Sequence, residues 1–333
     1  MKTQIVLTVD TEPSIAGAFD DPERYAPLLH EPVSGEVASK SEALGFILET
    51  LGRFQFRATF FVEALNTRYF PESVMGGYVE KLRESGQDIQ LHIHPNWARF
   101  KNGEYDPNCD ISDNCSDLDA DLLASLMDEG ASQIAAWTGR RPTAFRPGNF
   151  ATNLKVFDAM VKAGLTVSSN ICLAVRPPSE PELALWGGRH LIEGVREFPV
   201  TCFADRGPVG RGRPRPLQIT ALSAGEMRAV LKQVHRNRNG EDGSIAVIVT
   251  HPFEFIKKGD FRYSRIRPNR LVQGRLRSLC EFLQRESDRF EVVTLEEAAT
   301  GSSNWNASPP RLEGAAHRAL FRAGQNYLND LVQ

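Results

Sequence analysis

A regular alternation of strand-like and helix-like segments is the feature that most constrains the fold of this chain. Short apolar runs with the length and composition of buried strands occur at 4–9, 57–64, 88–94, 143–147, 166–172, 196–203, 244–250 and 290–295. Helical spacing of apolar residues fills most of the intervals, at 39–53, 70–85, 117–138, 152–163, 223–238 and 269–286. Strand followed by helix, repeated, predicts a parallel sheet covered by helices.

This alternation continues to about residue 298 without a Gly/Ser-rich linker. One α/β domain over residues 1–300, a closed or nearly closed distorted (β/α) barrel, is therefore a simpler solution than two domains, although 333 residues would allow either. A polar linker, GSSNWNASPP, follows, and the segment 311–332 has the pattern of a helix. We expect residues 301–333 to form a tail that packs on the barrel or mediates assembly into a homo-oligomer.

Three segments interrupt the alternation. Two of them, 13–37 and 100–116, follow the ends of predicted strands, where a β/α barrel keeps its active site, so we expect them to form walls of a substrate site. A run of aspartates begins in the second segment and consists of Asp106, Asp110, Asp113, Asp117, Asp119 and Asp121. This run lacks the central glycine and terminal glutamate of a calcium loop, which favours a solvated loop with Ser116 capping the next helix. The third segment, 205–216, is rich in Gly, Pro and Arg, and we expect no regular secondary structure there.

Composition narrows the classes of function. Hydrophobic residues make up 41% of the chain and charged residues 24%, and a formal charge of −3 gives no electrostatic reason to expect nucleic acid. Five cysteines without a C-x-x-C pair argue against a disulfide framework and favour a reducing compartment. The first apolar run is short and no later run approaches about 18 residues, so we expect no signal peptide, no transmembrane segment and a cytoplasmic location. A small molecule or a glycan is the expected partner.

Two carboxylates follow the first predicted strand, in the sequence IVLTVDTEP. Asp10 and Glu12 stand at i and i+2 where the apolar run ends, so both project from one face of the strand at the carboxyl edge of the sheet. Such a pair is costly unless a positive charge lies nearby. Taken alone, the motif is explained equally well by carboxylates that face water.

Two histidines lie two residues apart on another predicted strand, in GQDIQLHIHPNW. The strand rise places the Cα atoms of His92 and His94 ~6–7 Å apart, a separation from which two imidazoles can converge on one metal ion. Apolar neighbours point the opposite way, and Pro95 ends the strand directly afterwards. Hydrogen-bonded structural histidines are an equally good explanation of this motif alone.

Two further strands end in residues that can carry chemistry. In AFRPGNF, Arg146 could orient a carboxylate and keep it ionised, or could be an ordinary surface arginine. In IAVIVTHPFEF, His251 follows a buried strand, and a histidine there can reach the barrel mouth and act as a general acid. Together, the four motifs supply two carboxylates, an arginine and three imidazoles to one mouth, which is what metal-assisted hydrolysis requires.

The motifs also occur in the order found in the polysaccharide deacetylase family, the NodB-homology domain of carbohydrate esterase family 4, which the chain resembles over roughly residues 4–298. The matching pieces are TVDTE at 8–12, RATFFV at 57–62, GQDIQLHIH at 86–94, FRPG at 145–148 and VTHP at 249–252. The resemblance implies a distorted (β/α) barrel of about seven strands and metal-dependent removal of N- or O-acetyl groups from sugars. The D-T-E and L-H-x-H motifs of this chain are most similar to those of the deacetylase-like branch found with lipopolysaccharide and capsule biosynthesis.

Carried over by position, the resemblance implies a role for four residues. Asp10 would be the general base, and Arg146 would orient and ionise it. His251 would protonate the departing amine or alcohol, and His92 would bind the metal ion.

The sequence departs from the family pattern around the metal. Thr11 stands where family members have a second aspartate, so the carboxylate ligand would be Glu12. Asn96 stands where they have a second metal histidine, so that ligand would be His94. The aromatic residue that follows Arg-Pro-Pro in the family is also missing, with Gly-Asn at 148–149. The changes fall in one half of the site, which suggests a re-formed metal centre.

We therefore expect a carbohydrate deacetylase that depends on a divalent ion, Zn²⁺ or otherwise Co²⁺, Mn²⁺ or Ni²⁺, held by Glu12, His92 and His94. An acetylated sugar or glycan precursor, nucleotide- or lipid-linked, is the expected substrate. A phosphate group on such a precursor could bind to arginines of the segment 205–216, although a solvated loop explains these residues equally well. They are Arg206, Arg211, Arg213 and Arg215. Two alternatives stay open, namely another amidohydrolase on the same barrel, opening cyclic ureides, and a non-catalytic glycan-binding relative.

Overall fold

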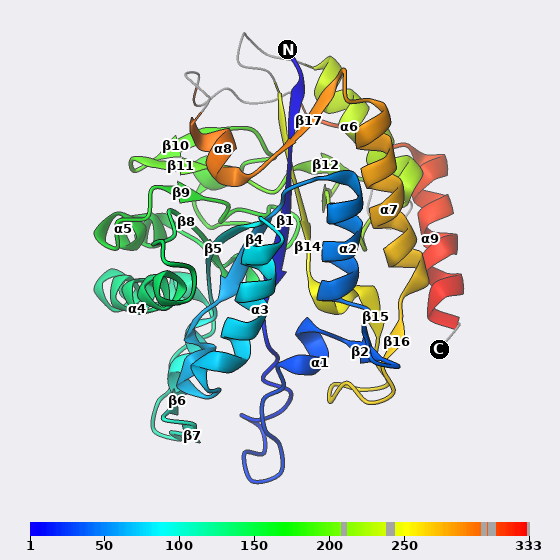
Figure 1. Ribbon diagram of the computed structural model, residues 1–333. Helices are drawn as coiled ribbons and strands as arrows, with labels where there is room; N and C mark the ends of the chain where they lie inside the picture. The colour runs from blue at the N-terminus through cyan, green and yellow to red at the C-terminus, as the bar shows by residue number, and fades with distance from the viewer. Residues whose placement is uncertain (208–211, 238–243, 301–304, 306–310, 332–333) are drawn as a thin grey trace.

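A curled, nine-stranded sheet forms the centre of the protein (Figure 1). The computed structural model describes residues 1–207, 212–237, 244–300, 305 and 311–331. In spatial order, the strands are β10 (His190–Ile192), β11 (Val195–Glu197), β9 (Val167–Ser168), β8 (Ala144–Pro147), β5 (Asp88–Ile93), β4 (Thr59–Glu63), β1 (Thr3–Thr11) and β14 (Ile245–Thr250), and β17 (Phe290–Val293) also pairs with β1. The pairings are parallel except that of β10 with β11. The expected parallel sheet is confirmed.

Helices follow most of these strands, and most of them cover one face of the sheet, whereas the short helix Leu295–Thr300 packs on the opposite face. They are α2 (Leu44–Phe54), α3 (Glu72–Glu84), α4 (Ala120–Thr138), α5 (Leu154–Lys162), α6 (Ala224–Arg236), α7 (Arg270–Arg285) and α8 (Leu295–Thr300), with a short α1 (His30–Val33) inside the first long loop. The expectation that Ser116 caps α4 was wrong. Ser116 lies in a separate turn, and the side chain of Asp119 accepts hydrogen bonds from the backbone N–H groups of Asp121 and Leu122.

Alternation of side chains along the strands creates two apolar layers. On β1, Ile5, Leu7 and Val9 belong to the large cluster that includes residues of α2, α4 and α7. Val6 belongs to a second cluster on the opposite face, together with Phe61 of β4. Because side chains repeat every second residue in a strand, Asp10 shares the second face with Val6.

Irregular backbone spans the interval between β14 and β9. The N–H of Thr201 donates to the carbonyl of Val247 (3.1 Å), and that of Val249 donates to the carbonyl of Leu217 (2.9 Å). On the other side, the N–H of Phe198 donates to the carbonyl of Ser168 (2.9 Å). The sheet is therefore a half-barrel that a non-strand segment extends, which is the distorted barrel expected from the sequence.

The predicted strand 196–203 is divided between β11 and a separate strand, β12 (Cys202–Ala204). β12 pairs antiparallel with β13 (Pro214–Pro216), so the expectation of no regular structure over 205–216 was wrong at its end. Prolines are tolerated there because β13 is an edge strand that need not donate from every residue.

The carboxyl end of β1 points to the lower end of the molecule in Figure 1. The segment 13–37 lies at this end, as does the small hairpin of β6 (Phe100–Lys101) and β7 (Glu104–Tyr105). Both loops expected to form walls of a site thus lie beyond the carboxyl ends of the strands.

The expected C-terminal helix is α9 (Ala316–Leu331), which packs beside α6 on the outside of the barrel (Figure 1). Buried Arg322 anchors it by donating to Glu226 (2.6 Å) and Asp205 (2.9 Å). Its outer face exposes Leu320, Phe321, Tyr327, Leu328 and Leu331. Except for Trp305, the predicted linker 301–310 lies outside the described residues, and assembly through α9 stays a prediction.

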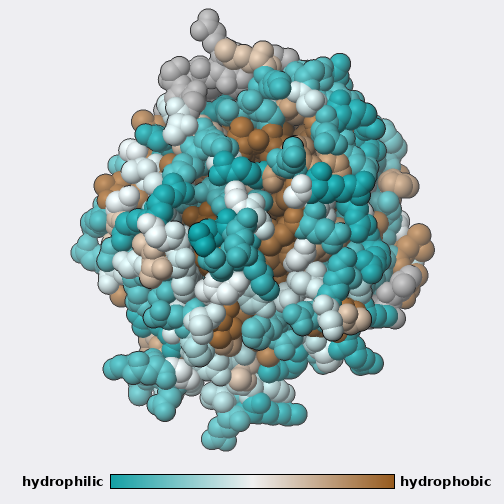
Figure 2. All heavy atoms as spheres, viewed as in Figure 1, coloured by the Kyte–Doolittle hydropathy of each residue, from teal (hydrophilic) through white to brown (hydrophobic). Residues whose placement is uncertain are grey.

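Polar residues cover most of the face shown in Figure 2, with apolar residues visible in the hollows between them. None of the described helices combines the length and the hydropathy needed to cross a bilayer.

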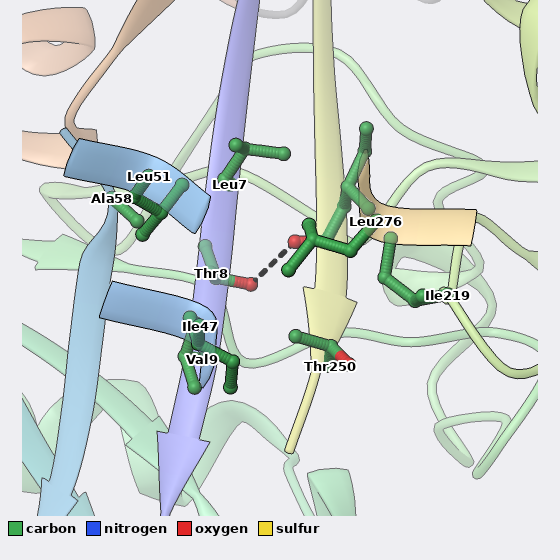
Figure 3. Close-up of a pocket in the computed structure, with 10 residues that line it drawn as sticks. Leu7, Thr8, Val9, Ile47, Leu51, Ala58, Ile219, Thr250 and Leu276 are labelled. Atoms are coloured by element: carbon green, nitrogen blue, oxygen red, sulfur yellow. Dashed lines mark hydrogen bonds between the residues drawn. The ribbon is translucent and has the colours of Figure 1, made fainter. Parts of the chain in front are cut away.

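A small apolar cavity of about 10 Å³ lies between β1, β14, α2 and α7 (Figure 3). At its wall, the hydroxyl of Thr8 donates to the carbonyl of Ile248 (2.8 Å), the dashed line in Figure 3. The hydroxyl hydrogen is thus donated to the backbone, and the oxygen of Thr8 accepts a hydrogen bond from Nη1 of Arg146 (2.9 Å).

Candidate active site and metal centre

The predicted site residues lie together at the carboxyl ends of neighbouring strands. β1 supplies Asp10 and leads into Glu12, β5 supplies His92 and leads into His94, β8 supplies Arg146, and His251 follows β14. All but the buried Arg146 line a pocket of about 260 Å³. The other residues lining it are Pro147, Asn149, Phe150, Val175, Gln218, Val249 and Phe253.

Three of these residues converge on one point. The Oε2 atom of Glu12 lies 3.0 Å from Nε2 of His92 and 2.8 Å from Nε2 of His94. The two imidazole rings meet edge to face, with centroids 5.1 Å apart. One donor atom from each residue lies within 4.8 Å of the others, as the ligands of a single metal ion do.

Whether these three residues suit a metal ion depends on which nitrogen of each imidazole carries the hydrogen. Nδ1 of His92 lies 2.8 Å from the carbonyl oxygen of Arg146, and Nδ1 of His94 lies 2.9 Å from a carboxylate oxygen of Asp113. Both oxygens can only accept, so each Nδ1 carries the hydrogen. In a neutral ring, the lone pair of Nε2 then points at the carboxylate of Glu12.

Lone pairs that face one another at these distances need a positive charge between them, which either a proton on one imidazole or a metal ion supplies. Two imidazole nitrogens and one carboxylate oxygen are a ligand set that Zn²⁺ accepts, with positions left for water and substrate. Hydrogen bonds from the distal nitrogens to oxygen acceptors are the usual support of such ligands. The residues therefore fit a divalent metal ion.

The charges of this group are coupled. Burial disfavours an ionised Glu12, but the charge and hydrogen bonds of His94 and His92 outweigh it and hold the pKa of the carboxyl well below its usual value. Burial disfavours a charged His94, but Glu12 and Asp113 outweigh it and hold the pKa of this imidazole well above its usual value. The site attracts positive charge.

Asp10 and Arg146 form the second half of the site. Nη1 of Arg146 donates to Oδ1 of Asp10 at 2.6 Å, and both side chains are buried. The remaining donors of the guanidinium reach Thr8 (2.9 Å) and Ser169 (2.7 and 3.0 Å), and its flat face lies 4.3 Å from the ring centroid of Phe61. The arginine is thus fixed on several sides, and it holds one oxygen of Asp10 in place.

The other oxygen of Asp10 faces His251. Oδ2 of Asp10 lies 3.7 Å from Nε2 of His251, whose Nδ1 lies 3.0 Å from Oε1 of Glu254. Gln218 also donates to this oxygen of Glu254. Burial lowers the pKa of His251, but the hydrogen bond and charge of Glu254 and the charges of Asp10 and Glu12 raise it to about 9. The imidazole is therefore protonated near neutral pH.

Sequence reasoning missed two carboxylates that hold the histidines. Glu254 stands three residues after His251 on a short 3-10 helix, and that spacing was a usable signal. Asp113 lies in the loop 100–116 and has no periodic signal. It was considered only as one member of an acidic run.

The turn after β8 is fitted closely to His94. A Cβ atom on Gly148 would lie 2.5 Å from the ring of His94, so a larger residue cannot occupy this position without moving the imidazole. Asn149 adopts a left-handed conformation (φ 57°), and its Nδ2 donates to Oδ2 of Asp113 at 2.8 Å. The Gly-Asn pair at 148–149 thus lies beside His94, the histidine expected to replace the second metal histidine of the family.

Two of the four arginines considered for phosphate binding are paired with carboxylates, and a third, Arg213, is exposed. Arg206 donates to Glu313 (2.7 Å), and Arg215 donates to buried Asp205 (2.6 Å). Arg211 lies outside the described residues. These contacts give no support to a phosphate site in this loop.

Comparisons with known proteins bear on the fold. No family model matches the chain, and no curated protein does. Among solved structures, a protein from Mycobacterium smegmatis assigned as a polysaccharide deacetylase is 16% identical, covering 93% of this chain and 95% of its own, with a TM-score of 0.54. The chain therefore shares the fold of that protein, which confirms the barrel expected from the motifs.

Two more distant likenesses are to the Xyl-CE4 domain of a multidomain xylanase from the hindgut metagenome of Trinervitermes trinervoides and to a peptidoglycan deacetylase from Bacillus subtilis. The first is 16% identical, covering 92% of this chain and 95% of the other, with a TM-score of 0.41. The second is 14% identical, covering 90% and 92%, with a TM-score of 0.38.

Proposed function

We propose that the protein is a metal-dependent carbohydrate deacetylase that removes acetyl groups from N- or O-acetylated sugars. The observation that carries the proposal is the meeting, in one pocket, of a three-donor metal group with a buried carboxylate and a protonated imidazole. Amide hydrolysis needs these parts: an electrophilic centre, a base for water and an acid for the leaving group. The shared fold with a protein assigned as a polysaccharide deacetylase supports the same activity.

Glu12, His92 and His94 would hold the metal ion, Zn²⁺ or otherwise Co²⁺, Mn²⁺ or Ni²⁺. When bound, such an ion supplies Lewis acidity to the acetyl carbonyl and to the attacking water.

The other residues move protons. Asp10 accepts a proton from the attacking water at Oδ2, because Oδ1 is already held by Arg146. As the carbon–nitrogen bond of the acetamide breaks, Nε2–H of His251 donates its proton to the departing amine. The products are acetate and a free amino sugar, or a free hydroxyl if the substrate is an ester.

We infer further that the substrate is an acetylated glycan precursor, nucleotide- or lipid-linked, modified in the cytoplasm during surface polysaccharide or lipopolysaccharide synthesis. All five cysteines are free thiols, and a reducing compartment preserves such thiols.

Metal content and acetate release test the proposal together. Purified protein should contain about one equivalent of divalent metal, and it should release acetate from an N-acetylglucosamine oligomer or a sugar nucleotide. The double variant His92→Ala/His94→Ala should lose both properties, whereas His317→Ala, on the exposed side of α9, should keep both.

Protein that binds no divalent metal and releases no acetate would contradict the proposal. Protein that binds metal and acetylated glycan without releasing acetate would favour the non-catalytic alternative. Release of a carbamoyl acid from a cyclic ureide, in place of acetate from sugars, would favour the other amidohydrolase.

A further inference from the structure

One metal-binding histidine is supported by the sheet and the other by a loop. Nδ1 of His92 is held by the backbone carbonyl of Arg146, its register partner on β8. Nδ1 of His94 is held by the side chain of Asp113, which lies beyond the carboxyl end of the sheet in the loop 100–116. The orientation of the third ligand therefore depends on where this loop lies.

Hydrogen bonds and burial of its neighbours hold Asp113 in place. Its second oxygen accepts a hydrogen bond from Asn149, so its two carboxylate oxygens bridge the loop to the turn after β8. On one side of it, Arg99 donates to the carbonyl of Ile111 (2.9 and 3.1 Å). On the other side, Cys115 is fully buried. These contacts fix the loop on both flanks of the carboxylate.

Gly148 packs against the ring of His94. Because a Cβ at that position would overlap the ring, a glycine is needed there to leave room for the observed orientation. Gly148, Asn149 and Asp113 thus act on one imidazole: the first defines its plane, and the other two fix the hydrogen on Nδ1. Nothing comparable is required for His92, which the strand pairing already orients.

We propose that Asp113 is a positioning residue of the metal centre, held by Asn149, and that metal binding and the order of the loop 100–116 are thermodynamically linked. The inference rests on the proposed function only in that Glu12, His92 and His94 bind a divalent ion. A carboxylate behind a metal histidine strengthens the ligand and orients it, and its loss typically weakens metal binding about 10–100-fold. Linkage is reciprocal, so a metal ion that uses His94 must also hold the loop in place.

Metal affinity, measured by Co²⁺ absorption and by competition with a chelator, tests the first part. Asp113→Ala should weaken binding about 10–100-fold. Asp113→Asn keeps an acceptor oxygen without the charge and should give a smaller loss. Asn149→Gly removes the amide donor but suits the positive φ, so it should weaken binding in the same direction without backbone strain.

Asp110→Ala is the matched control. This aspartate lies in the same loop, its side chain is 98% exposed, and it contacts Arg99 rather than the histidines. Its metal affinity should equal that of the unchanged protein.

Hydrogen exchange tests the linkage. Adding Zn²⁺ to the unchanged protein should slow exchange of amides in 100–116, and this protection should be smaller in Asp113→Ala and Asn149→Gly.

The outcomes separate the two proposals. If the unchanged protein binds metal and Asp113→Ala binds it equally well, Asp113 has no positioning role, and the deacetylase proposal stands. If the unchanged protein binds no metal, both fall. If Asp113→Ala is unstable by circular dichroism, Asn149→Gly decides, because an unaltered metal affinity in that variant overturns the inference.

Discussion

The two halves of the candidate site are built in different ways. In the half formed by Asp10 and Arg146, the two side chains are 3% and 0% exposed and come from strands of the sheet. In the metal half, Glu12 and His94 are 17% and 16% exposed, and Asp113, which holds His94, is 35% exposed. Strand register fixes the first half, whereas loops complete the second. Changes in the first should therefore damage chemistry and stability, and changes in the second should adjust metal affinity.

The largest expected effect comes from the base. Asp10→Asn keeps the shape but cannot accept a proton, so kcat for acetate release should fall about 10²–10⁴-fold. Metal affinity should not change, because Asp10 does not belong to the metal group. Parallel measurement of acetate release and metal binding checks both statements, and a variant that loses its metal would break the division between the halves.

The next effect is on stability. Arg146→Met removes one partner of a buried ion pair and leaves Asp10 without its counter-charge, so the free energy of unfolding should fall by ~3–5 kcal/mol. Urea denaturation measures this loss. The exposed Arg83, paired with Glu80, is the control, and Arg83→Met should have little effect.

A double variant sharpens this prediction. Asp10→Leu/Arg146→Met replaces both charges with apolar side chains, and it should be more stable than Arg146→Met alone. A double variant no more stable than the single one would show that packing around the guanidinium, rather than the unpaired charge, accounts for the loss.

A smaller effect is expected in the metal half. Gly148→Ala should displace the ring of His94 and weaken metal binding on the scale of a lost supporting contact, about 10–100-fold. Gly77→Ala in α3, where an added Cβ meets nothing within 4 Å, is the control. Unchanged metal affinity in Gly148→Ala would contradict the role of Gly148 in placing the ring of His94.

The smallest effect is a shift in pH dependence. With a pKa of about 9, His251 should remain the proton donor through neutral pH, and acetate release should fall as pH rises through about 9. Glu254→Gln removes the hydrogen-bonded charge that raises this pKa, so the alkaline limb should move toward lower pH. Asp10 and Glu12 also face His251 and limit the size of the shift.

The same group affects stability. A pKa raised in the folded state stabilises the protein fully below the unfolded value of 6.5, and this stabilisation is lost as pH rises through about 9. Thermal unfolding across this pH range should show the loss in the unchanged protein and less of it in Glu254→Gln.

Strand-end residues could be located from the sequence because parallel strands bring their carboxyl ends to one edge. Asp10, His92, Arg146 and His251 each follow an apolar run, and the structure places them around one pocket. Their roles in binding and catalysis stay predictions.

Loop-dependent features could not be located in the same way. The contact of Asp113 with His94 depends on the path of 100–116, and that of Asn149 depends on a left-handed residue. The wrong assignment of Ser116 as a helix cap has a local origin, since several polar residues before α4 could have served equally well. Local pattern decides position along a strand, but it does not decide where a long loop returns to the sheet.

The end of strand β1 sets the spacing of two carboxylates of the candidate site. This end presents Asp10 and Glu12 to the pocket, while Thr11 between them is fully buried. A single residue inserted between the two carboxylates would turn one of them to the opposite face of the strand. The proposed proton acceptor and the proposed metal ligand are thus spaced by the covalent chain itself. Changes in the loops around the pocket therefore leave the spacing of these two carboxylates unaltered.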